Sequence, residues 1–185
     1  MNNEFLEFVK EFEKKLKEYN KVHNITRLKD IIKEANDSIL VCDFCKFDDN
    51  KTIADIGSGA GFPAIFLAFL NPKCNFYLFE PSYKKSAFLF IVKTYFSLNN
   101  VNILTKKVEC ESSIKADIIT SRAFAKTDTI VKLCDNISNL DTKFIFYKGS
   151  FVKNELDCLN DYELFEYKSR IFLQFFKKNC KYVTD

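Results

Sequence analysis

The sequence predicts an α/β fold in which a mostly parallel, seven-stranded sheet ends in an antiparallel hairpin and follows an N-terminal helical extension. Two observations support this prediction. Between residues 52 and 147, short apolar runs of strand length alternate with longer runs of helical periodicity, a pattern typical of parallel strands joined by right-handed crossovers. The last two strand-like runs, 162–167 and 170–176, have no helix between them, so we expect them to form the hairpin.

The length of 185 residues suits a single domain. Within residues 1–185 we distinguish a helical extension, 1–50, from a core, 51–185. Asp48-Asp49-Asn50 is a turn signal and marks the entry to the first strand. We see no internal repeat and no low-complexity tract, so nothing suggests a second domain.

The individual elements follow from the periodicity of the apolar residues. Helices are expected at residues 4–19, 29–42, 62–70, 83–97 and 127–137, with a short one near 153–159. Strands are expected at residues 52–56, 75–80, 101–105, 117–121 and 143–147, before the hairpin. In the first helix, aromatic and leucine side chains recur at three- and four-residue intervals with Glu and Lys between them. This amphipathic stripe favours a core contact over a partner site.

Three of the four glycines in the chain, Gly57, Gly59 and Gly61, fall within five positions after the first predicted strand. Glycine permits positive φ and lets a ligand approach the main chain, although an ordinary strand-to-helix turn is the alternative. A dinucleotide fold requires G-x-G-x-x-G, but the third glycine here comes one residue early and Phe62 fills that position. G-x-G-x-G after an acidic strand residue, here Asp55, is typical of class I, Rossmann-like methyltransferases that use S-adenosyl-L-methionine (SAM). A carboxylate also suits the ammonium group of SAM better than a pyrophosphate.

Ligands of such sheets bind at the carboxyl ends of the strands. The second strand ends in Glu80, where a carboxylate can accept hydrogen bonds from both ribose hydroxyls, the alternative being a surface charge. After the third strand, Val108 is placed to pack on the adenine and Glu109 to lie near its polar edge. Basic residues also follow the strand ends: Lys84, Lys85, Lys106, Lys107, Arg122, Lys126 and Lys148. They form a predicted basic rim, unless the abundance of lysine explains them.

Composition narrows the class of protein further. The formal net charge of +3 permits nucleic-acid binding without requiring it. The seven scattered cysteines are expected to be buried, reduced thiols of a cytoplasmic protein. No second pair follows Cys42-x-x-Cys45 and His23 is the only histidine, so we expect no metal. We expect no signal peptide and no membrane span, because acidic residues interrupt the first turns and no apolar run approaches about 20 residues.

Several stretches together resemble one family, the bacterial 16S rRNA (guanine-N7) methyltransferases, also called glucose-inhibited division protein B. The resemblance covers residues 19–149, and a weaker similarity covers residues 170–177. It rests on Asn20 to Thr26, Asp37-Ser38, Asp55 to Pro63, Lys84 to Leu89, Val108-Glu109, Ser121 to Ala125 and Lys148-Gly149. The chain departs from the usual family pattern at four positions. Tyr19 stands where tryptophan is common, and Glu34 stands where a histidine is usual. Glu80 stands where aspartate is usual, and Ala64 stands where a glycine is frequent.

The resemblance implies a SAM-dependent enzyme that methylates N7 of a guanine in the decoding-region hairpin loop of 16S rRNA. It implies SAM contacts at Gly57, Phe62, Val108, Glu109 and Arg122, although from the residues alone Arg122 suits either the cofactor or a phosphate. On this reading Lys84, Lys85 and Lys148 would bind the RNA. We expect a cytoplasmic monomer that acts on 16S rRNA within the small ribosomal subunit or an assembly intermediate.

Guanine N7 carries an in-plane lone pair, so its methylation requires no side chain to remove a proton, and no catalytic side-chain base is expected. The chain also lacks an Asn/Asp-Pro-Pro-aromatic motif and a Pro-Cys pair, which are associated with exocyclic-amine and cytosine-C5 methylation. Two rival hypotheses stay open. One is a SAM methyltransferase with another substrate, which RNA crosslinking would distinguish. The other is a non-catalytic SAM-binding ribosome-assembly factor, which labelled methyl transfer to RNA would distinguish.

Overall fold

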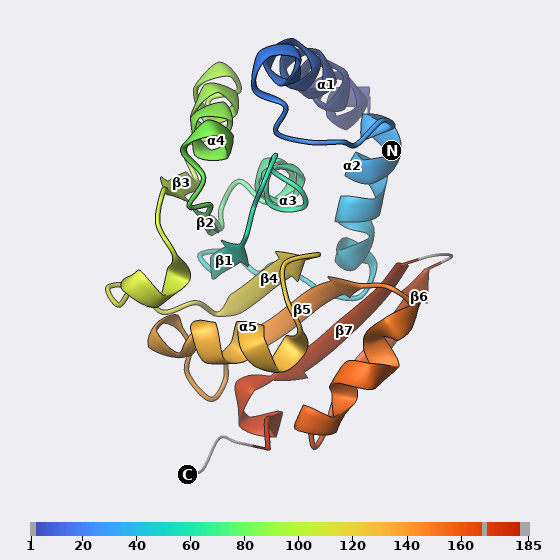
Figure 1. Ribbon diagram of the computed structural model, residues 1–185, viewed down its shortest axis with the longest axis vertical. Helices are drawn as coiled ribbons and strands as arrows, with labels where there is room; N and C mark the ends of the chain where they lie inside the picture. Colours follow the sequence, from blue (N-terminus) through green and yellow to red (C-terminus); the bar gives the residue numbers. More distant parts are fainter. Residues whose placement is uncertain (1–2, 168–169, 182–185) are drawn as a thin grey trace.

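The computed structural model describes residues 3–167 and 170–181 and contains the predicted seven-stranded sheet (Figure 1). The strand order is β3-β2-β1-β4-β5-β7-β6. The strands are β1 (Thr52–Ile56), β2 (Asn75–Phe79), β3 (Val101–Leu104), β4 (Ile118–Arg122), β5 (Lys143–Lys148), β6 (Glu163–Tyr167) and β7 (Arg170–Phe176). The first five pair in parallel, whereas β7 runs antiparallel to both β5 and β6, which confirms the predicted end hairpin.

Helices cover both faces of the sheet. The α-helices are α1 (Asn3–His23), α2 (Ile31–Ile39), α3 (Ala64–Leu70), α4 (Tyr83–Tyr95) and α5 (Thr127–Leu133). The 3-10 helices are η1 (Leu40–Asp43), η2 (Val108–Cys110), η3 (Asp135–Ile137), η4 (Ser150–Cys158) and η5 (Lys177–Asn179). In Figure 1, α1 to α4 lie on one side of the sheet and α5 on the other.

Three predicted helices differ from the observed ones in their start, their continuity or their type. Helix α2 begins at Ile31, because the side chain of Asp30 caps it by accepting a hydrogen bond from the backbone N–H of Lys33 at 2.9 Å. The helix predicted at 127–137 is divided into α5 and η3, which meet at Cys134. The short helix expected near 153–159 is the 3-10 helix η4.

The apolar stripe of α1 is buried, as predicted. Phe5, Phe8 and Phe12 are each less than 5% exposed and pack against α3, where the rings of Phe8 and Phe69 stack with centroids 4.0 Å apart. This aromatic layer joins the N-terminal extension to the sheet in one apolar core. A second core lies on the opposite face, beneath α5, η3 and η4. The shared first core supports the predicted single domain, which stays a prediction.

The cysteines follow the predicted burial only in part. Cys45, Cys74 and Cys134 are buried thiols, whereas Cys42 and Cys110 are exposed, so the expectation of burial was wrong for those two. Among the described residues, no group of three or more His, Cys, Asp or Glu side chains is arranged to hold a metal ion. None of the helices in the described ranges is long and apolar enough to cross a membrane.

Candidate functional site

The glycine-rich turn directly follows β1 and adopts the backbone torsions that its sequence predicts. Gly57, Gly59 and Gly61 have φ values of +72°, +58° and +98°. A Cβ atom at Gly57 would lie 2.6 Å from the Phe124 ring, and one at Gly61 would lie 2.8 Å from Ile65. A Cβ at Gly59 would meet only the Gly57 carbonyl oxygen, at 3.7 Å. Packing therefore requires the outer two glycines, while the space beside Gly59 stays open for a ligand.

Asp55 lies at the carboxyl end of β1 and is 1% exposed. Its Oδ1 accepts a hydrogen bond from the Thr120 hydroxyl at 2.7 Å, but within the described residues its buried Oδ2 has no partner. Burial raises the pKa of Asp55 to about 6, against the lowering effect of hydrogen bonds from Ser58 and Thr120. An unpartnered buried carboxylate oxygen is costly alone and fits a ligand ammonium group. Asp55 is therefore suited to the α-amino group of SAM.

Glu80 follows β2 and supports the turn from the side. Its Oε2 accepts the N–H of Gly59 at 2.8 Å, its Oε1 accepts the N–H of Ser82 at 2.9 Å, and the residue is 5% exposed. Each carboxylate oxygen keeps a further lone pair for a ribose hydroxyl. The buried position of Glu80 argues against the alternative of a simple surface charge.

A pocket of about 220 Å³ opens between the glycine turn and the loop after β3. It is lined by Ile56, Gly57, Phe79, Pro81, Lys106, Lys107, Val108, Glu109, Phe124 and Leu133. Val108 is buried and Glu109 exposed, as an apolar wall and a polar edge for adenine require. We call this the cofactor pocket. It brings together Gly57 from the turn after β1 with Val108 and Glu109 from η2, next to Asp55 and Glu80.

Phe62 is placed differently from the other predicted cofactor residues. Its side chain is 7% exposed and packs in the core, edge-on to Phe12 with ring centroids 5.6 Å apart and against Phe66 at 4.9 Å. The Phe62 ring does not line the cofactor pocket. A contact from Phe62 to SAM would therefore have to come from its main chain, and it stays a prediction.

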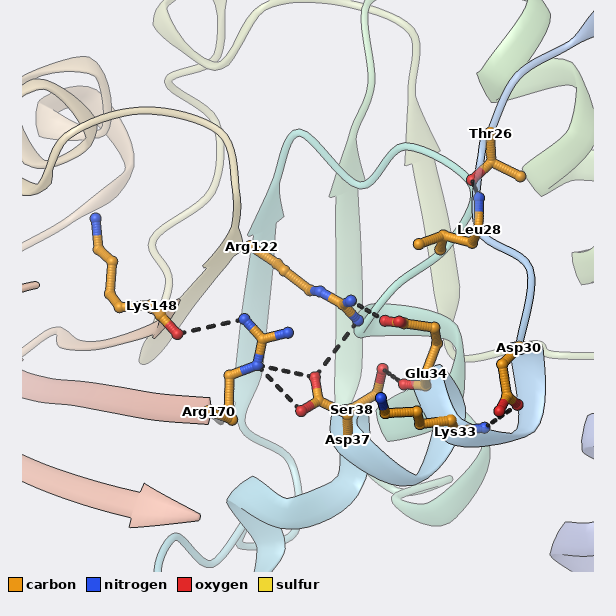
Figure 2. Close-up of polar contacts among 10 residues, drawn as sticks. All are labelled: Thr26, Leu28, Asp30, Lys33, Glu34, Asp37, Ser38, Arg122, Lys148 and Arg170. Carbon is orange, nitrogen blue, oxygen red and sulfur yellow. Dashed lines mark hydrogen bonds and ion pairs between the residues drawn. The ribbon is translucent and has the colours of Figure 1, made fainter. Parts of the chain in front are cut away.

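Arg122, at the end of β4, lies in a network of charges with helix α2 (Figure 2). Its guanidinium forms ion pairs with Glu34 and with Asp37, the latter at 3.7 Å. Asp37 also accepts hydrogen bonds from Nε of Arg170 at 3.0 and 3.1 Å, and Nη1 of Arg170 donates to the Lys148 carbonyl at 3.3 Å. The cofactor contact predicted for Arg122 stays a prediction, because Arg122 does not line the cofactor pocket.

The same network explains a residue that departs from the family pattern. Glu34 occupies the position where the resembling family has a histidine, and in the structure it forms an ion pair with Arg122. Sequence reasoning missed this pairing. The available signal was the spacing of Glu34 and Asp37, which places both carboxylates on one face of α2. Their cationic partners come from β4 and β7, which only the tertiary structure brings to that face.

The basic rim is only partly available to a ligand. Lys84 is exposed and Lys85 half-buried, both at the start of α4. Lys106 forms an ion pair with Glu111 at 2.7 Å. The side chain of Lys148 is only 10% exposed, and its Nζ lies 2.6 Å from Oε2 of Glu155 and 3.2 Å from the Ala125 carbonyl oxygen. The RNA contact predicted for Lys148 therefore stays a prediction, and its ammonium group already has two partners in the protein.

Together, the fold and the site define a class of protein. A seven-stranded sheet with one antiparallel strand inserted beside β5, and a glycine turn with two acidic residues at its carboxyl edge, are the marks of a class I SAM-dependent methyltransferase. Residues 4–184 match the model of the family described as rRNA small subunit methyltransferase G, and the chain belongs to that family.

Relatives and solved structures agree with this assignment. The ribosomal RNA small subunit methyltransferase G of Campylobacter jejuni subsp. doylei is 48% identical over 88% of this chain and 86% of its own. The protein of the same name from Helicobacter pylori is 36% identical over 85% and 89%. A SAM-dependent O-methyltransferase from Thermotoga maritima aligns with a TM-score of 0.64 at 13% identity, over 84% of this chain and 69% of its own. At that identity, the likeness concerns the fold alone.

The raised pKa of Asp55 predicts that SAM affinity depends on pH. The ammonium group of SAM stays mostly protonated below pH 7 and prefers the ionised carboxylate, so binding should strengthen as the pH rises through about 6. We expect the Kd to fall about tenfold between pH 5 and pH 7, measured by calorimetry. Asp55→Asn should bind more weakly at pH 7 and lose this dependence. If the Kd of the Asp55→Asn variant changes with pH as steeply as that of the wild type, the titrating group is not Asp55.

Proposed function

We propose that this chain transfers the methyl group of SAM to N7 of a guanine in the decoding-region hairpin loop of 16S rRNA. It acts in the cytoplasm as a monomer, on the small ribosomal subunit or an assembly intermediate. Two things support the proposal: membership of the rRNA small subunit methyltransferase G family, and the resemblance in sequence to the guanine-N7 enzymes. The observation that carries it is the unpartnered oxygen of Asp55 beside the open glycine turn.

The chain's residues have orienting roles in this reaction. When bound, SAM supplies an electrophilic methyl group on a sulfonium centre. Asp55 holds the ammonium end, Glu80 the ribose and Val108 the adenine, so the cofactor is fixed at both ends. Because N7 attacks with a free lone pair, no side chain has to remove a proton. Holding the two reacting atoms in line contributes up to about 7–11 kcal/mol for well-oriented partners.

The surface around the site suits a single-stranded RNA loop. Three aromatic side chains are exposed after strands of the sheet: Tyr83 at 82%, Phe124 at 45% and Phe151 at 78%. Exposed rings stack on unpaired bases, and nearby lysines neutralise phosphates. Lys84 and Lys85, next to Tyr83, supply that charge. A hairpin loop offers both unpaired bases and a phosphate backbone.

Labelled SAM, incubated with small subunits that lack the modification, tests the proposal. We expect label in 16S rRNA, and borohydride reduction followed by aniline should cleave the product at one guanine, because N7 methylation makes that nucleoside labile.

In the same assay, the double variant Lys84→Gln, Lys85→Gln should raise KM for subunits and flatten its salt dependence without changing SAM affinity. The pair Lys46→Gln, Lys73→Gln at the other edge of the sheet is the control.

Each negative result has a distinct meaning. Methyl on a ribose, an exocyclic amine or a cytosine would defeat the N7 assignment, and label in protein alone would favour another substrate. SAM binding without any methyl transfer would favour an assembly factor. An unchanged KM and salt dependence in the double variant would remove Lys84 and Lys85 from the RNA surface.

A further inference from the structure

A second pocket lies beside the cofactor pocket and shares one wall with it. The second pocket has a volume of about 210 Å³. Its lining includes Ser121 and Ala123 at the end of β4, Gly149 after β5, and Phe124, which also lines the cofactor pocket. Both pockets therefore open at the carboxyl ends of parallel strands, on either side of Phe124. A ligand in the second pocket would be next to bound SAM, where a methyl acceptor has to lie.

The polar groups of this pocket come from a half-buried ion pair between Lys148 and Glu155. Oε2 of Glu155 accepts hydrogen bonds from Lys148 Nζ at 2.6 Å, from the Thr127 N–H at 2.8 Å and from the Thr127 hydroxyl at 2.8 Å. Oε1 of Glu155 has no hydrogen-bond partner in the part of the chain that the structure describes. Burial raises the pKa of Glu155, but the hydrogen bonds from Lys148 and Thr127 outweigh it and lower that pKa. An ionised acceptor and an ammonium donor thus lie side by side at the pocket.

We propose that this second pocket holds the target guanine and that Glu155 and Lys148 read its Watson–Crick edge. The proposal rests on the proposed function. Guanine presents two donors, N1–H and the 2-amino group, next to the acceptor O6. Glu155 Oε1 accepts from the donors, and Lys148, an ammonium with three N–H donors, donates to O6. In adenine, N1 is an acceptor and the 6-amino group is a donor. Bound adenine would therefore leave Glu155 and Lys148 without hydrogen-bond partners, which disfavours its binding.

The orientation that follows suits N7 chemistry. In a purine, N7 lies on the Hoogsteen edge, next to the 6-substituent and outside the donor groups of the Watson–Crick edge. Glu155 comes from η4 and Lys148 from β5, while the shared wall with the cofactor pocket is Phe124. A guanine held by its Watson–Crick edge therefore keeps N7 free of these contacts, and in this proposal N7 faces the shared wall and the cofactor. Flipped bases are generally read in this way, by hydrogen bonds to the Watson–Crick edge and by apolar walls, here Phe124 and Ile130.

The size of the pocket fits one base. Pockets for drug-sized ligands span about 300–1,000 Å³, and a single nucleobase is smaller than such a ligand. The pocket at about 210 Å³ is correspondingly smaller. The rest of the nucleotide would lie outside the pocket. The pocket therefore accommodates a base extruded from a loop without room for a base pair.

Binding of free nucleotides tests the assignment without requiring methyl transfer. We would titrate GMP, IMP and AMP into the protein saturated with S-adenosylhomocysteine and follow binding by NMR. IMP lacks the 2-amino group, so wild type should bind GMP roughly 10- to 100-fold more tightly than IMP, as expected for one hydrogen bond to a charged acceptor, and AMP more weakly still. In Glu155→Gln the preference for GMP over IMP should fall below threefold.

Thr127→Val is the matched control. Glu155 also anchors Thr127 at the start of α5, so a purely structural role predicts that both variants lower the melting temperature and leave base preference unchanged. We expect Thr127→Val to keep the preference for GMP and Glu155→Gln to lose it. Equal binding of GMP and IMP by wild type, or a retained preference in Glu155→Gln, would overturn the assignment. If either of these results is found and rRNA is still methylated at N7, the base-pocket proposal fails and the proposed function stands. If the preference for GMP depends on Glu155 but rRNA is not methylated, the proposed function fails and the base pocket stands.

Discussion

Replacing Gly59 with valine is expected to abolish SAM binding while the protein still folds. Gly59 has a φ of +58°, and its added Cβ would meet only the Gly57 carbonyl oxygen at 3.7 Å. The Cβ would therefore clash with no part of the protein, and the side chain would extend into the open side of the turn, where the cofactor is expected to approach. Left-handed backbone costs a non-glycine residue about 1–2 kcal/mol, so a modest fall in melting temperature should accompany the loss.

Gly61→Val provides the contrast for this prediction. A Cβ at Gly61 would lie 2.8 Å from Ile65 and 3.3 Å from Leu89, both in the core. This variant should lose more stability than Gly59→Val, because its side chain displaces packed neighbours. Calorimetric titration with SAM and thermal unfolding of both variants separate the two effects. Wild-type affinity in Gly59→Val would show that the cofactor does not approach this turn.

The second large effect is expected at Glu80. Glu80→Ala should weaken SAM binding by roughly 10- to 100-fold, because each hydrogen bond to a charged acceptor contributes about 1.5–3 kcal/mol. The variant also removes the acceptor for the Gly59 N–H, so the turn itself loses a support. Glu80→Gln, which keeps one oxygen acceptor, should be intermediate.

Asp117→Ala is a matched control for Glu80. The carboxylate of Asp117 also accepts a backbone N–H, that of Thr52 at 2.8 Å, and forms an ion pair with Lys51, but it lies at the opposite edge of the sheet. The Asp117→Ala variant should have a lower melting temperature and an unchanged SAM affinity in the same calorimetric titration. A change in affinity below threefold in Glu80→Ala would return Glu80 to the role of a buried structural acceptor.

Local patterns in the sequence were sufficient for the elements and for the cofactor pocket. Strand and helix periodicities depend on neighbours a few residues apart, and parallel crossovers place all strand ends at one edge. Val108 and Glu109 line one pocket with Gly57, and their predicted contacts to the cofactor stay a prediction. The boundaries of α2 and α5 depended on a cap at Asp30 and a break at Cys134, and the sequence pattern did not reveal them.

The sequence by itself therefore determined the sheet, the glycine turn and the acidic residues Asp55 and Glu80 at the strand ends, because each is encoded by residues close in the chain or by the end of a strand. Only the tertiary structure decided which charges neutralise one another. Lys148 reaches Glu155, and Arg122 reaches Glu34, 88 positions away. The energy of an ion pair depends on the distance and burial of its two groups, and no local pattern encodes either. This is why Lys148 looked like a free surface cation in the sequence and is a half-buried, paired cation in the fold.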